Sequence, residues 1–214
     1  MRVFRFWILP ALVFYALALG ALSLGGFTVT EILRDPAQSL RVSSLLGFLS
    51  NVGVWFWVAA SAICFSSMAM RGQTGPGQAD MRKISLALGA FSLLLAADDL
   101  FMIHDRYIAE GIMVPIYIYL LWRLLRHHGA TVMGIEKTAF LAAAGLLAGS
   151  VMVDAVQEIL PVSYSASQIV EEGCKFLGGA SWLYFCHRVA SFGLARATAP
   201  DDQHVEVVID ETSP

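Results

Sequence analysis

The chain has 214 residues, of which 57% are hydrophobic and 14% are charged, whereas about a quarter of the residues in an average soluble domain are charged. A soluble domain of this length has too little interior to hide so much apolar surface, so the composition excludes the ordinary soluble classes. The net charge of -3 and the lack of a Lys/Arg cluster argue against nucleic acid as a partner. The lipid bilayer is the predicted partner.

Uncharged runs predict an all-α bundle of six transmembrane helices, because a bilayer core needs about 20 helical residues. The predicted segments are 6–27, 43–70, 84–107, 112–126, 138–159 and 167–189. The first is longer than the apolar core of about 7 to 15 residues in a signal peptide, so we expect a retained helix, with a cleaved signal peptide as the alternative. Tyr117 and Trp122 suit a membrane interface near the short fourth segment.

The third segment crosses only if it includes acidic residues. Its uncharged part, from Ile84 to Ala97, is too short, so the helix must continue through Asp98 and Asp99 towards Tyr107. Beyond the sixth segment the sequence becomes polar and acidic, with too few apolar residues to pack. We therefore expect one transmembrane domain over 1–193 and a disordered cytoplasmic tail over 194–214.

The Lys and Arg residues give the bundle an orientation through the positive-inside rule. With a cytoplasmic N-terminus, ten of the 14 Lys and Arg residues fall on inner segments and three on outer ones, while Lys175 lies within the sixth helix. This bias alternates from loop to loop. The sequence therefore predicts a multi-pass protein of the plasma (inner) membrane with both termini in the cytoplasm.

On this topology, acidic residues of the third, fifth and sixth helices gather in the outer half of the membrane. Asp98 and Asp105, seven residues apart, share one stripe of the third helix, and Asp154 and Glu158 are one turn apart on the fifth. His104 lies at the same level but points about 120° away from Asp98 on a continuous helix.

Such acids need compensation, because a charge at mid-membrane costs at least about 2.5 to 3.5 kcal/mol on insertion scales. Lys175 is placed to neutralise Glu171 or Glu172, one turn away, and Arg106 to neutralise another acid. The remaining surplus predicts bound cations or shared protons, with a hard divalent metal ion of open identity as the cofactor. The predicted ligands are Asp98, Asp99, His104, Asp105, Asp154, Glu158, Glu171 and Glu172.

Three functions fit this predicted site. The leading hypothesis is ion transport through the carboxylates, and the second is a metal-dependent hydrolase acting on a lipid-like membrane substrate. The third is a non-catalytic subunit whose acids pair with a basic membrane partner or with another copy of the chain. No G-x-S-x-G, Walker or H-E-x-x-H motif decides between them. A further alternative places the acids at the interface, in ordinary hydrogen bonds or ion pairs.

Overall fold

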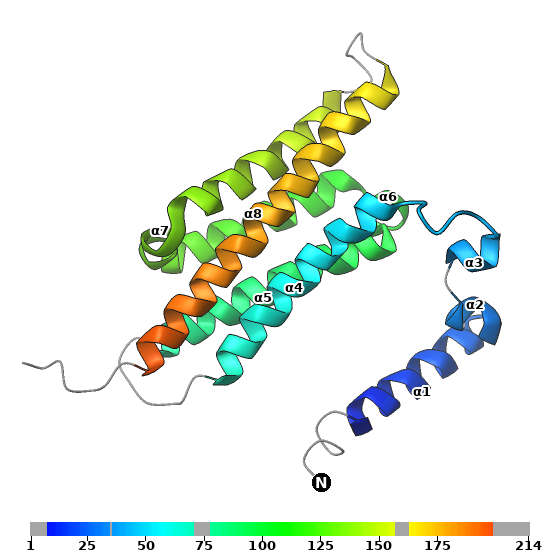
Figure 1. Cartoon of the computed structure of the whole chain (residues 1–214), viewed down its shortest axis with the longest axis horizontal. Helices are drawn as coiled ribbons and strands as arrows, with labels where there is room; N and C mark the ends of the chain where they lie inside the picture. Colours follow the sequence, from blue (N-terminus) through cyan, green and yellow to red (C-terminus); the bar gives the residue numbers. More distant parts are fainter. Residues whose placement is uncertain (1–7, 35, 71–77, 157–162, 199–214) are drawn as a thin grey trace, which may run out of the picture. The chain divides into compact units, whose positions relative to one another are not determined.

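The computed structural model describes residues 8–34, 36–70, 78–156 and 163–198 (Figure 1). Within these ranges the regular structure is entirely helical and no strand occurs, which confirms the all-α class. The chain divides into two compact units, Met1–Phe48 and Leu49–Pro214. Each unit is described by itself.

The first unit contains a long apolar helix and two short ones, α1 (Leu9–Leu24), α2 (Val29–Leu33) and α3 (Pro36–Leu40). No residue of α1 is buried, so its apolar surface is available to lipid. A capping box starts α2: the backbone N–H of Glu31 donates to Thr28 Oγ1 at 3.3 Å, and the backbone N–H of Thr28 donates to Glu31 Oε2 at 2.8 Å. Hydrogen bonds from the Thr28 hydroxyl and backbone lower the pKa of the Glu31 carboxyl.

The second unit contains the remaining helices. These are α4 (Phe48–Met70), α5 (Gln78–Phe101), α6 (Ile103–Arg106), α7 (Glu110–Val156) and α8 (Tyr164–Thr198). Among the described residues, α4, α5 and α7 are long and apolar enough to cross a membrane. By length and composition, these three helices give the chain the character of a membrane protein.

The helix α7 is bent back on itself at Glu136, whose φ of -157° and ψ of 78° are not helical. The ring of Tyr117 lies 6.0 Å from that of Phe91, and Phe140 lies 6.2 Å from Trp182, which itself packs on Phe91. Tyr117 and Phe140 would be about 34 Å apart on a straight helix. The two arms of α7 therefore run in opposite directions, as Figure 1 shows.

Three of the predicted segments differ clearly from the helices in the structure. The helix expected over 167–189 runs from Tyr164 to Thr198, so α8 includes the first residues of the predicted tail. The helix expected over 112–126 begins at Glu110 and continues to the bend at Glu136. Its extra residues include basic side chains, which end an uncharged run without ending a helix. The helix expected over 84–107 is interrupted at Met102, and a separate short helix, α6, follows.

Aromatic side chains fill the middle of the second unit. Trp182 of α8 is 2% exposed and donates through Nε1 to the hydroxyl oxygen of Ser92 on α5 at 2.8 Å. The rings of Phe91, Phe140 and Phe185 pack around it. This core joins α5, α7 and α8.

Candidate functional site

The side chain of Asp98, in the last turn of α5, is buried and held by donors from two other helices. Asp98 is 5% exposed. The backbone N–H of His104 donates to Oδ1 at 2.9 Å, and the hydroxyl of Tyr117 donates to Oδ2 at 2.6 Å. The Nδ1 atom of His104 lies 3.0 Å from the same Oδ2. Protein groups thus occupy both oxygens of this carboxylate.

A break in the backbone produces this arrangement. Met102 adopts a left-handed conformation, with φ of 50° and ψ of 48°, which a residue with a side chain rarely takes. The chain turns there and α6 starts, and Asp98 accepts a bond from one of the N–H groups left open at its start. The expectation that His104 points away from Asp98 assumed a continuous helix. The turn at Met102 brings the two residues into contact.

The neighbouring residue, Asp99, is held by α4 and α8. Trp57 donates through Nε1 to Oδ2 at 2.8 Å, and the ammonium of Lys175 lies 2.7 Å from Oδ1. The side chain of Asp99 is 11% exposed and that of Lys175 is 31% exposed. Lys175 is thus a supporting charge, but the carboxylate it contacts belongs to Asp99 of α5 rather than to Glu171 or Glu172 of its own helix.

Three further acids, on α7 and α8, interact electrostatically with Lys175 or with one another. Glu171 accepts a hydrogen bond from Nε2 of Gln168 at 2.7 Å and interacts electrostatically with Asp154, Glu172 and Lys175. Lys175 in turn interacts electrostatically with Asp98, Asp99 and Glu172. We call these five acids the carboxylate cluster: Asp98, Asp99, Asp154, Glu171 and Glu172.

Two of the predicted site residues lie outside the described side chains, and a third lies apart from the cluster. Glu158 lies outside the described residues, and so does the side chain of Asp105, although its backbone belongs to α6. Arg106 is exposed and makes no ion pair with any acid whose side chain is described. Among the described side chains, Lys175 is therefore the cation that contacts the cluster.

The carboxylates of the cluster outnumber the one lysine that interacts with them in the described part of the chain. Four of the cluster's carboxylates, those of Asp98, Asp99, Glu171 and Glu172, interact electrostatically with Lys175, and the fifth, Asp154, interacts with Glu171. In the described part of the chain, no three His, Cys, Asp or Glu side chains come together closely enough to hold a metal ion. The acids that are held most firmly, Asp98 and Asp99, face protein donors.

Sequence reasoning did not identify two of the residues that hold the cluster, Trp57 and Tyr117. Tyr117 was expected at a membrane interface, and its hydroxyl instead binds Asp98 inside the unit. A signal for both exists in general chemistry, because an indole N–H or a phenol O–H inside an apolar bundle needs an acceptor. The acids of the third predicted helix are acceptors of this kind.

Residues 5–189 match the protein family described as a domain of unknown function, DUF8692. The chain belongs to this family. The match begins before α1, ends within α8 and includes the whole carboxylate cluster. Comparisons with curated proteins and with solved structures gave no match. A DUF family carries no activity in its description, so the function is argued from the geometry.

Proposed function

We propose that this DUF8692 protein crosses the plasma (inner) membrane six times, with both termini in the cytoplasm. The six spans are α1, α4, α5, the two arms of α7, and α8. The bend of α7 supports this count, since it turns one long apolar helix into two antiparallel passes. Basic residues support the orientation, because Lys83, Arg123 and Arg188 belong to the opposite end of the second unit from the cluster.

We further propose that the carboxylate cluster binds cations in the outer half of the membrane and that it serves ion transport. The observation that carries this proposal is the buried Asp98 beside the largely shielded Asp99, two acids that together are held by donors from α4, α6, α7 and α8. Ionisable groups inside a membrane are costly and typically belong to ion pathways or proton relays. The surplus of carboxylates over Lys175 favours cations or protons as the cargo.

Lys175 fits the role of an internal counter-ion in this proposal. Its ammonium sits on Asp99, and the charge of Glu172 also attracts it. A lysine carries its charge on a flexible four-carbon stem, so the ammonium can move between nearby carboxylates. A cation that arrives at Asp99 would displace the ammonium towards Glu172. When the cation leaves, the ammonium of Lys175 would return to Asp99, so the negative charge of Asp99 is neutralised in both states.

The transport test uses the full chain in proteoliposomes loaded with a dye for protons or for divalent cations. We expect saturable uptake of protons or of one of Mg²⁺, Mn²⁺ and Ca²⁺. Asp154→Asn and Glu172→Gln should each reduce uptake to the level of empty liposomes, because each removes a charge from the cluster. The matched control is Asp80→Asn, which neutralises an exposed acid on α5 far from the cluster and should leave uptake unchanged.

Three results would count against the proposal. One is wild-type uptake no faster than that of empty liposomes for every ion in the panel. The second is unchanged uptake in both cluster variants, and the third is an equal loss in Asp80→Asn. Elemental analysis of the detergent-purified protein adds an independent reading for a divalent cargo, since bound metal should be lost in Asp154→Asn and retained in Asp80→Asn.

A further inference from the structure

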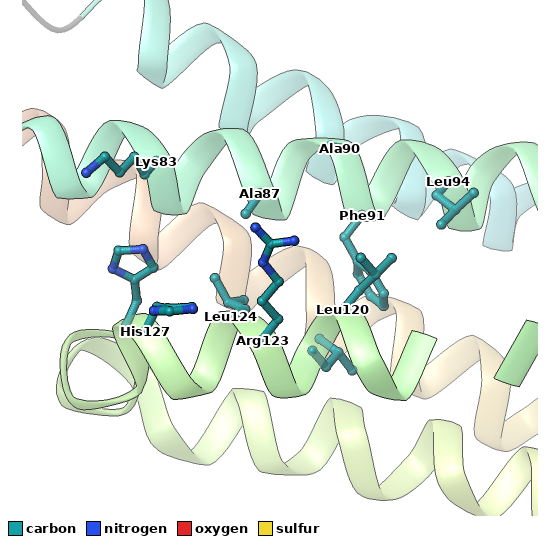
Figure 2. Close-up of a pocket in the computed structure, with 11 residues that line it drawn as sticks. Lys83, Ala87, Ala90, Phe91, Leu94, Leu120, Arg123, Leu124 and His127 are labelled. Carbon is teal, nitrogen blue, oxygen red and sulfur yellow. The ribbon is translucent and has the colours of Figure 1, made fainter. Parts of the chain in front are cut away.

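A groove lies between α5 and the first arm of α7 and runs along α5 from Lys83 to Leu94, so the Lys83 end is the one away from the carboxylate cluster (Figure 2). Its volume is about 490 Å³. We call it the basic groove, because four basic side chains line it: Lys83, Arg123, His127 and His128. None of the described acids lines it.

The basic groove changes in character along its length. Figure 2 shows Lys83 and His127 at one end and Leu94 towards the other, with Arg123 between them. Ala90, Phe91, Leu94, Leu120, Leu121 and Leu124 make most of its remaining wall. From Lys83 to Leu94 the helix rises about 16 Å, roughly half the thickness of a bilayer core. The groove is thus cationic at the helix end and apolar towards the middle of the membrane.

The basic side chains at the cationic end of the groove are available to bind an anionic ligand. Arg123 is exposed and makes no ion pair with a described acid. Lys83 lies 3.5 Å from Asp80, but the two side chains are 69% and 64% exposed, so water screens their attraction. An anion placed between α5 and α7 would meet the Arg123 guanidinium, which can donate two parallel hydrogen bonds to a phosphate.

We propose that the basic groove binds an anionic phospholipid of the cytoplasmic leaflet. The phosphate of the lipid lies against Arg123 and Lys83, and one acyl chain follows the apolar wall past Phe91 to Leu94. A free phosphate would use only the cationic end, whereas a lipid matches both ends, and basic pockets between helices at the cytoplasmic side suit anionic headgroups. This inference rests on the membrane orientation proposed above, but it does not depend on what the carboxylate cluster binds.

The test measures lipid retained on the purified full chain by native mass spectrometry. Dioleoyl-phosphatidylglycerol is compared with dioleoyl-phosphatidylcholine, which has the same acyl chains and no net charge. We expect preferential retention of the anionic lipid, reduced about fivefold by Arg123→Gln and by Lys83→Gln, as one cation near a membrane surface contributes. Arg126→Gln is the matched control, because Arg126 lies on the same arm, stacks on Trp122 at 5.4 Å and does not line the groove.

A second variant tests the acyl-chain half of the proposal without changing charge. Ala90 lines the groove and is exposed, so Ala90→Trp should fill the apolar wall and reduce retention of the anionic lipid. Asp154→Asn should retain the lipid as the wild type does, which separates this inference from the transport proposal. Inorganic phosphate at the same concentration should not displace the lipid.

Four outcomes would overturn the inference. Equal retention of the two lipids would remove the role of charge, and an equal effect of Arg126→Gln would show that the groove has no special part in it. Unchanged retention of the anionic lipid in Ala90→Trp would show that the acyl chain does not lie along the apolar wall. Displacement of the lipid by inorganic phosphate would assign the site to a small anion.

Discussion

The two ends of α5 each carry an aspartate paired with a lysine, and the two pairs lie in different environments. Asp80 and Lys83 are 3.5 Å apart, with side chains 64% and 69% exposed. Asp99 and Lys175 are 2.7 Å apart, with side chains 11% and 31% exposed. The first pair joins neighbouring turns of one helix, whereas the second joins α5 to α8. The same two residue types therefore form a hydrated pair within one helix at one end of α5 and a shielded pair between two helices at the other.

This difference has a physical cause. A carboxylate that is buried or largely shielded from water must find its donors within the protein, so Asp98 and Asp99 take theirs from α4, α6, α7 and α8. An exposed charge finds compensation in water or in an external ligand, so Lys83 and Arg123 need no fixed partner. Substitutions in the cluster should therefore affect stability, and substitutions in the basic groove should affect ligand binding.

The largest effect on stability is expected from Lys175→Met. Among the described residues, the change leaves Asp99 with the indole of Trp57 as its one donor, so the free energy of unfolding should fall by about 2 to 3 kcal/mol. Chemical denaturation of the detergent-purified protein measures this loss. Adding Asp99→Asn to Lys175→Met should restore much of it, because the uncompensated charge is then removed. A single variant as stable as the wild type would show that Lys175 is not the counter-ion of Asp99.

A smaller loss is expected from Tyr117→Phe, which removes the 2.6 Å hydrogen bond to Asp98 and keeps the ring that packs on Phe91. A hydrogen bond to a charged group contributes about 1.5 to 3 kcal/mol, and the backbone of His104 still serves Asp98, so the loss should lie near the lower bound. Tyr119→Phe is the control, because Tyr119 lies on the same arm with its side chain exposed. The same denaturation experiment compares the two variants, and equal stability would contradict the predicted role of Tyr117.

The gathering of acids at one end of the bundle could be predicted because it depends only on helix order and length. Uncharged runs locate the helices, and antiparallel passes bring the end of α5 and the start of α8 to one level. The contact between Asp99 and Lys175 follows this logic, since Asp99 lies in the last turn of α5 and Lys175 lies in the first half of α8. Hydropathy and spacing are therefore enough to predict which helix ends carry these acids.

The partners within the site were not predictable in the same way. A left-handed residue such as Met102 carries no strong sequence signal, since glycine or asparagine is the usual choice there. That one residue ends α5 and returns His104 to Asp98. The choice of Asp99 over Glu171 for Lys175 depends on how α5 and α8 face one another, which spacing along a single helix does not contain.

The smallest effect on stability is expected from Lys83→Gln, and it sharpens the comparison most directly. Exposed pairs such as Lys83 and Asp80 contribute little, so the free energy of unfolding should change by less than about 0.5 kcal/mol. The same variant should lose anionic lipid severalfold, whereas Lys175→Met should lose stability and keep its lipid. Denaturation and native mass spectrometry on both variants give four readings. If Lys83→Gln proves as destabilising as Lys175→Met, the two ends of α5 do not differ in the way their exposures indicate, because both lysines would then hold the helices together.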